Sequence, residues 1–378
     1  MPPQKILDTH IHLWPSTSVS STDHGWMTAG HMLAKRHGVS DYTSTTTSTS
    51  PVQPSGFIYV ETDRYLPTPK PSISASSTQD AKVQALKTWA NEPLQELKFL
   101  RRIVENKPNP GDGFNAGDGA LMLGCVIWAP FHTSPLLFNL YLQIAEEVTG
   151  PLLWERVVGF RYLLQGKEEG EVERLVKTED WLSNLLRLRE GRKGRGWSFD
   201  VGVDAHQDGV AVVEVVADMV GKVRALESSS PEAGNVRFIL NHLCKPAISS
   251  PANPWPSFPR YTAALSRLGA DKNIFMKLSG AFNEFEPGPT PPAVEDILDC
   301  LYPYLKHVSR AFKSRVMFGS DWPVCNIGGP MGEQSWELWR EVVESWLERK
   351  GDGEEDVWWR AGCEAYGIEG LGDGKVQS

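Results

Sequence analysis

The sequence predicts an α/β protein built as one (β/α)8 barrel of the TIM type. Eight short apolar or β-branched runs alternate along the 378 residues with stretches of helical periodicity. Continuous apolar runs are typical of parallel strands that are buried on both faces. An open, doubly wound parallel sheet is the alternative, but eight strand–helix units in one chain favour a closed barrel.

The expected elements follow one another in a regular order. The eight predicted strands are residues 5–13, 56–62, 121–131, 157–164, 198–205, 236–243, 273–282 and 315–324. The predicted helices are residues 80–105, 136–148, 171–189, 209–227, 258–268, 293–312 and 333–349. Together they assign the whole chain, residues 1–378, to a single barrel domain with loop insertions.

Three segments interrupt this pattern. Residues 40–50 hold nine Ser or Thr in eleven positions, and residues 67–77 and 108–119 are rich in Pro, Ser or Gly. Such segments have little apolar area to bury, which predicts loops. We therefore expect insertions in the barrel, of which residues 40–50 and 67–77 are flexible.

The charge and composition of the sequence argue against some classes of binding partner. The net charge is −9 and there is no basic patch, which argues against nucleic acid. No run approaches the ~18 apolar residues of a membrane span, and no signal peptide is visible at the N-terminus. The five cysteines form no CxxC pair or disulfide framework. A cytoplasmic enzyme with a small-molecule substrate is the expectation, with homo-oligomerisation left open.

The sharpest candidate for chemistry is the HxH pair formed by His10 and His12. Side chains alternate along a strand, so both imidazoles face the same way, and Asp8 shares that parity. Two converging imidazoles suit a divalent ion such as Zn²⁺ or Mn²⁺. The alternative is a polar rim without a metal.

Further polar residues stand at the ends of other predicted strands. His206 and His242 follow the fifth and sixth apolar runs, and Asp321 lies in the sequence GSDWP after the eighth. Active sites of such barrels lie at the carboxyl ends of the strands. A carboxylate there can take a proton from an attacking water. Taken one at a time, these residues also fit packing or helix-capping roles.

Strand four contributes Arg161 and, just after it, Gln165 as candidate substrate-binding residues. Arg161 stands inside an apolar run, so its charge must be buried or directed into the barrel mouth. A guanidinium there suits a substrate carboxylate or carbonyl oxygen. A structural ion pair with Glu61 or Asp63 is an equally good explanation.

These motifs resemble the amidohydrolase superfamily. The segments DTHIHLW, GFRYLLQ, FDVGVDAH, FILNHLCKP, MKLSGAF and VMFGSDWPV are similar to its amidohydrolase-2 branch, which contains sugar-lactone and dicarboxylate-lactone hydrolases. The resemblance runs from Ile6 to about Val324. It implies that His10, His12, His206 and Asp321 hold a metal ion, and that His242 and Asp321 act in catalysis.

The resemblance also implies a reaction: opening of a sugar-acid or dicarboxylate lactone, with Arg161, Gln165 and His242 holding the substrate. Many members with two metal ions carry a carboxylated lysine or a glutamate at the end of strand four, and this chain has neither. We therefore expect one divalent ion, with a metal-free site as the alternative. A decarboxylase on the same barrel and a non-catalytic barrel are the rival functions.

Overall fold

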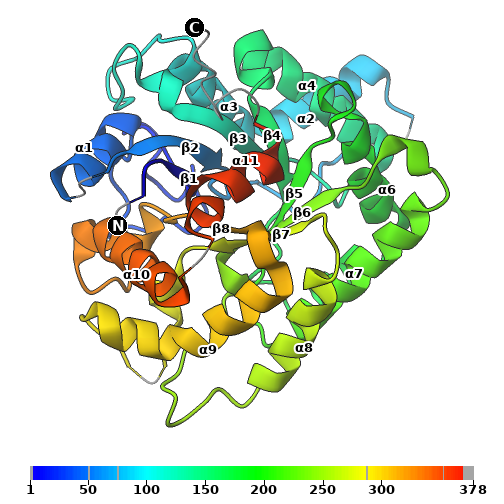
Figure 1. Ribbon diagram of the computed structural model, residues 1–378. Coiled ribbons are helices and arrows are strands. Elements are labelled where there is room, and N and C mark those ends of the chain that lie inside the picture. The colour runs from blue at the N-terminus through cyan, green and yellow to red at the C-terminus, as the bar shows by residue number, and fades with distance from the viewer. Residues whose placement is uncertain (1–2, 50–51, 75, 287, 352, 369–378) are drawn as a thin grey trace, which may run out of the picture.

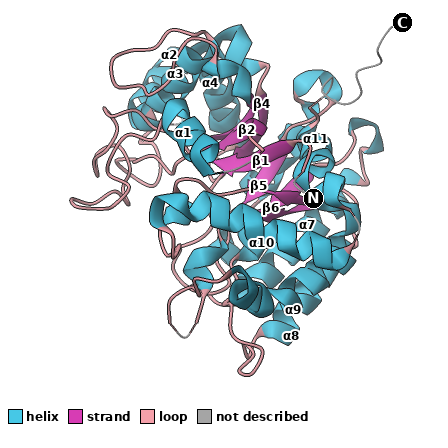
Figure 2. Cartoon of the chain, turned by 60° about the vertical axis from the view of Figure 1, so that its left-hand side comes forward, coloured by secondary structure: helices cyan, strands magenta, loops and turns pink. Residues whose placement is uncertain are grey.

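The computed structural model describes residues 3–49, 52–74, 76–286, 288–351 and 353–368. Its strands form one parallel sheet in the order β1 to β8, which confirms the predicted TIM barrel. Figure 2 shows the strands at the centre with helices around them. The strands are β1 (Ile6–Ile11), β2 (Pro54–Val60), β3 (Met122–Trp128), β4 (Val157–Arg161), β5 (Ser198–Val201), β6 (Arg237–Leu240), β7 (Ile274–Leu278) and β8 (Val316–Phe318).

Helices follow each strand and cover the outside of the barrel (Figure 1). They are α1 (Val39–Thr49), α2 (Gln79–Trp89), α3 (Asn91–Val104), α4 (Pro135–Trp154), α5 (Glu171–Val176), α6 (Glu179–Arg187), α7 (Ala211–Glu227), α8 (Phe258–Gly269), α9 (Val294–Phe312), α10 (Ser335–Lys350) and α11 (Ala361–Tyr366). The expected helix over residues 80–105 is two helices, because the backbone of Ala90 leaves the helical conformation.

The loop predicted for residues 40–50 is wrong for its described part, which forms α1. Its Ser/Thr-rich sequence hides one apolar contact stripe: Val39, Tyr42 and Thr46 are buried. Tertiary packing of this stripe outweighs the weak helix propensity of Ser and Thr. Residue 50 lies outside the described residues, and the flexibility of residues 40–50 and 67–77 stays a prediction.

The barrel interior is filled with side chains at its amino-terminal end. Leu7, Ile58, Val126, Val158, Ile239, Phe275 and Met317 project from seven strands into one buried cluster. Trp359 and Tyr366, in and just before α11, belong to the same cluster. In Figure 1 α11 lies over the middle of the strands. This closed floor leaves the opposite, carboxyl-terminal mouth for a ligand.

Among the described residues, no helix is both long enough and apolar enough to cross a membrane.

Candidate functional site

The barrel closes where β1 meets β8. Residues at this junction, called the seam below, form the candidate site. The Asp321 N–H donates to the His10 carbonyl and the His12 N–H donates to the Trp322 carbonyl, each at 2.8 Å. Gly319 allows this close approach: a Cβ added there would lie 3.1 Å from the Cβ of His10. Asp321 itself has φ +63°, a strained value for a non-glycine residue of the kind found at functional sites.

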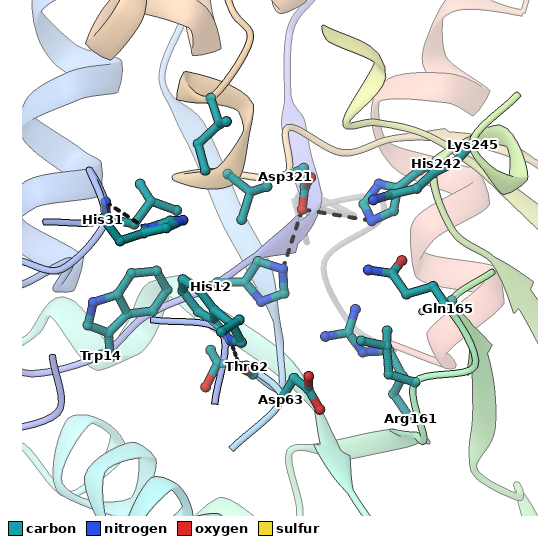
Figure 3. A pocket seen from close by; sticks show the side chains of 16 residues that line it. His12, Trp14, His31, Thr62, Asp63, Arg161, Gln165, His242, Lys245 and Asp321 are labelled. Atoms are coloured by element: carbon teal, nitrogen blue, oxygen red, sulfur yellow. Dashed lines mark hydrogen bonds and ion pairs between the residues drawn. The ribbon is translucent and has the colours of Figure 1, made fainter. Parts of the chain in front are cut away.

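Three imidazoles surround one carboxylate oxygen. Asp321 Oδ1 lies 3.3 Å from His12 Nε2, 3.6 Å from His10 Nε2 and 3.8 Å from His242 Nε2. The Nε2 atoms of His10 and His12 are 3.2 Å apart. Figure 3 shows His12 and His242 directed at Asp321 from two sides. The structure thus brings together four of the five residues that the sequence singled out.

This donor set fits one divalent ion. Ligand atoms of His10, His242 and Asp321 all lie within 4.8 Å of one another. Zinc bound at ~2.0–2.1 Å in a tetrahedron has ligand atoms about 3.3–3.4 Å apart, close to the separations observed. Two imidazoles and one carboxylate are also a ligand set used by catalytic zinc.

Contacts at Nδ1 orient the imidazoles of His12 and His242. His12 Nδ1 lies 2.8 Å from the Val60 carbonyl, which only accepts, so Nδ1 carries the proton and the lone pair of Nε2 faces Asp321. His242 Nδ1 lies 2.8 Å from Ser279 Oγ. Such contacts behind a ligand fix its tautomer and ring orientation.

His10 has a different neighbour. Lys277 Nζ lies 3.2 Å from His10 Nδ1 and donates to Asp200 Oδ2 at 2.8 Å. An ammonium that donates to Nδ1 places the proton of a neutral His10 on Nε2, facing the cluster. Metal ligation by His10 requires the reverse, with the proton on Nδ1 and Lys277 Nζ as its acceptor.

The pKa shifts at the cluster favour an anionic Asp321 beside neutral His10 and His242. Burial lowers the pKa of His242 to about 3, against the opposing charge of Asp321. Burial and the charge of Lys277 hold the pKa of His10 well below its usual value. Burial raises the pKa of Asp321, but His242 and His12 outweigh it and lower that pKa to about 2. Neutral imidazoles and an ionised carboxylate are the forms that bind metal.

His206, expected among the metal ligands, does not join this cluster. Its Nδ1 lies 2.9 Å from Glu284 Oε2 and its Nε2 lies 2.5 Å from Glu286 Oε1. Burial lowers the pKa of His206, but the hydrogen bonds with Glu286 and Glu284 raise it overall. The physical reason is distance along the chain: β5 ends at Val201, so His206 belongs to the loop beyond the barrel mouth.

Asp8 does not share the face of the two histidines either. The β1–β2 register is irregular between Asp8 and Ile11, which breaks the simple alternation. The Asp8 carboxylate accepts from Tyr42 Oη at 2.9 Å, Trp336 Nε1 at 3.0 Å and the Ser320 N–H at 2.8 Å. It ties α1 and α10 to the seam from outside the cluster.

A pocket of about 220 Å³ opens above the cluster. It is smaller than the ~300–1,000 Å³ typical of drug-sized ligands, which suits a small molecule. His12, His242 and Asp321 form one part of its lining. Arg161 and Gln165 line it as well, as their candidate roles require (Figure 3).

Arg161 also makes the ion pair that was the alternative explanation. Its Nε donates to Glu61 Oε1 and its Nη2 to the Glu61 carbonyl, both at 2.5 Å. The same guanidinium lines the pocket. The ion pair and the place in the pocket are therefore compatible.

One wall of the pocket was not anticipated from the sequence. The long segment between β1 and α1 supplies Trp14, Trp26, His31 and Leu33 to the lining. The density of tryptophan and histidine in this segment was the available signal. Lys245 is a further lining residue; its Nζ lies 3.8 Å from Asp204 Oδ2 and 3.9 Å from Glu284 Oε1.

Known proteins resemble the chain at the level of sequence. A family model described as Amidohydrolase matches residues 218–348. An L-fucono-1,5-lactonase of Burkholderia ambifaria is 34% identical over 108 residues, which span 28% of this chain and 33% of that protein. An L-fucono-1,5-lactonase of Burkholderia multivorans is 28% identical over 243 residues, or 61% of this chain and 72% of that protein.

Solved structures share the barrel. An amidohydrolase of Burkholderia multivorans with bound zinc is 21% identical, with a TM-score of 0.61 over 97% of this chain and 100% of that one. At 21% identity, the similarity shows that the two proteins share a fold. The family match over residues 218–348 and the two lactonase relatives show that the chain resembles amidohydrolases in sequence, and the solved structure shows that it shares their barrel fold.

Proposed function

We propose that this protein hydrolyses a small cyclic ester, a sugar-acid lactone. One observation carries the proposal: an ionised carboxylate, Asp321, stands among three imidazoles at the edge of a small pocket. This arrangement can activate water and polarise a carbonyl in one place. The two L-fucono-1,5-lactonases among the relatives support a lactone as the ester.

A metal ion belongs to the proposal. We assign one divalent ion to His10, His242 and Asp321, with His12 beside it; ligation by His10 requires a neutral Lys277 that accepts from His10 Nδ1. The zinc in the structurally similar amidohydrolase supports zinc over manganese. When bound, such an ion supplies Lewis-acid polarisation of the lactone carbonyl. His206 is left out of this set because both of its ring nitrogens face glutamates.

Side chains of the protein carry out the other steps of the proposed hydrolysis. Asp321, ionised at neutral pH, takes a proton from the water that attacks the carbonyl carbon. His242 Nε2 faces the same space: with the ion bound it is a ligand, and in a site without metal it would orient the carbonyl or the water. Arg161 and Gln165 hold hydroxyl oxygens of the sugar acid from the other part of the pocket.

The charges around the pocket favour a neutral lactone over a dicarboxylate lactone. Each of the two cations that line the pocket has carboxylate neighbours: Arg161 has Glu61, and Lys245 has Asp204 and Glu284. Asp321 adds negative charge to the lining. A substrate with two carboxylates would meet no surplus of positive charge.

A substrate panel tests the proposal. Purified protein is incubated with L-fucono-1,5-lactone, with a lactone that bears two carboxylates, and with aromatic carboxylic acids. Acid release is followed with a pH indicator, and CO₂ release is measured for the rival decarboxylase. We expect acid release from the neutral lactone that Asp321→Asn abolishes. CO₂ release without lactone opening would establish the decarboxylase instead.

A further inference from the structure

Asp63 is a carboxylate of the pocket to which the proposed mechanism gives no role. It lies three residues after the end of β2 and lines the same pocket as Asp321. Its backbone has φ +52°, and its N–H donates to Glu61 Oε2 at 2.7 Å. A left-handed conformation at a residue with a side chain costs energy and is concentrated at functional sites.

The side-chain carboxylate of Asp63 is available to a ligand. Among the described residues it takes part in no hydrogen bond and no ion pair of its side chain, and it is reached by solvent through the pocket. The charged and titratable groups that face it are Glu61 just after β2, Arg161 and Tyr162 from β4 and its loop, and Lys167 beyond them. Of these cations, Arg161 is held by Glu61.

Asp63 and Asp321 stand on different sides of the space that a substrate would occupy. Figure 3 shows Asp321 with His12 and His242, and Asp63 across the pocket beside Arg161. A lactone whose carbonyl faces the histidines therefore has room to turn its ring oxygen toward Asp63. The leaving oxygen of an alkyl ester is strongly basic and needs a proton as it departs.

We propose that Asp63 is a further catalytic residue, the general acid that protonates the ring oxygen of the lactone. The inference rests on the proposed lactone hydrolysis. The water oxygen bonds to the carbonyl carbon and its proton passes to Asp321. The bond from the carbonyl carbon to the ring oxygen then breaks, the electron pair stays on that oxygen, and Asp63 supplies its proton. Asp321 releases its proton to solvent, Asp63 regains one, and the products sum to lactone plus water.

The electrostatics support this division of roles. Partial withdrawal from bulk water in the pocket and the charge of Glu61 raise the pKa of Asp63, against the opposing charges of Arg161 and Lys167. A carboxyl group with a raised pKa keeps its proton to higher pH, as a general acid requires.

Leaving-group dependence tests the proposal. The rates of wild type and Asp63→Asn are compared on L-fucono-1,5-lactone, whose leaving group is an alkoxide, and on dihydrocoumarin, whose leaving group is a phenoxide that needs little protonation. We expect kcat/KM of the variant to fall about 100-fold on the sugar lactone and only a few-fold on dihydrocoumarin. Wild-type kcat/KM should fall as pH rises past the pKa of Asp63, and this limb should vanish in the variant.

Matched variants complete the test. Asparagine tolerates left-handed backbone, and unchanged thermal unfolding verifies the fold. Asp63→Glu, which keeps an acid, should retain the alkaline limb, and the exposed Asp180→Asn should behave as wild type. Equal loss on both lactones, or a limb that survives in Asp63→Asn, would overturn the inference alone. A wild type that opens neither lactone would overturn the proposed function and this inference with it.

Discussion

At the scale of single residues, Asp321 lies beyond the end of β8 and is positioned by a backbone hydrogen bond to β1. It follows β8 in a left-handed conformation, and its N–H donates to the His10 carbonyl, which fixes the carboxylate beside the imidazoles. A group fixed in this way loses little free energy to reorganisation when charge develops.

Asp321→Asn should therefore remove activity and leave the fold in place. An amide has a similar shape but cannot take a proton, so we expect kcat to fall by ~10²–10⁴-fold. The measurement is lactone opening with thermal unfolding as the fold control, and the exposed Asp180→Asn is the matched variant. Activity within a few-fold of wild type would exclude Asp321 as the base.

Arg161 and Glu61 allow a prediction about stability. Their side chains are 6% and 1% exposed, and removal of one partner leaves a buried charge without compensation. Glu61→Gln should lower the free energy of unfolding by about 3–5 kcal/mol.

Urea unfolding measures this loss. The exposed pair Arg260–Glu214 provides the control, since its side chains are 58% and 35% exposed. Glu214→Gln should cost at most about 1 kcal/mol. Equal costs for the two variants would show that the barrel relaxes around Arg161.

Sequence reasoning at this scale succeeded where a residue lies within a strand or within three residues of its end. His10, His12, His242 and Asp321 meet because parallel strands bring their carboxyl ends together. It failed for His206, which lies five residues beyond β5, and for Asp8, which lies at an irregular register. Neither a loop path nor a bulge leaves a periodic signal in one sequence.

At the scale of elements, all eight strands were predictable because their apolar runs are continuous. Helix α1 was not, since eight of its eleven residues are Ser or Thr and the signal for burial rests on Val39 and Tyr42. The hydroxyl of Tyr42, in α1, bonds to Asp8 in β1. That contact only becomes visible once β1 and α1 are placed in space.

Tyr42→Phe tests whether α1 stabilises the barrel. The substitution keeps the ring and removes one of the donors to a buried carboxylate, so unfolding should become easier by about 1–2 kcal/mol. Thr47→Ala, on the exposed face of α1, should cost less than about 0.5 kcal/mol. Chemical denaturation compares the two; equal, negligible effects would mean that α1 contributes little to stability.

At the scale of the whole molecule, buried neutral histidines make stability depend on pH. Burial and the charge of Arg64 lower the pKa of His24 to about 2, and burial and Lys35 lower that of His37 to about 4. Both values lie below the ~6.5 of an unfolded histidine. As pH falls below ~6.5, the unfolded chain takes up protons that the folded chain refuses, so stability decreases.

We expect the free energy of unfolding to fall from about pH 6.5 toward pH 4 through both groups, by ~1.4 kcal/mol per pH unit for each fully titrating histidine. Urea unfolding at pH 7, 6 and 5 measures the slope. In His37→Gln the slope should be shallower, because one proton-binding group is lost from the unfolded chain. The same slope in wild type and variant would show that His37 is already charged in the fold.

The number of metal ions that each chain binds is a second property that can be predicted at the scale of the whole barrel. A second ion needs a bridging ligand, and β4 supplies Arg161 at its end, a cation without a lone pair that is already bound to Glu61. We expect at most one tightly held divalent ion per chain after dialysis, measured by elemental analysis. His242→Ala should lower that content, whereas His206→Ala should leave it unchanged because His206 lies with Glu284 and Glu286. Two retained equivalents that are both needed for activity would contradict the single-ion site, and metal loss in His206→Ala would return His206 to the ligand set.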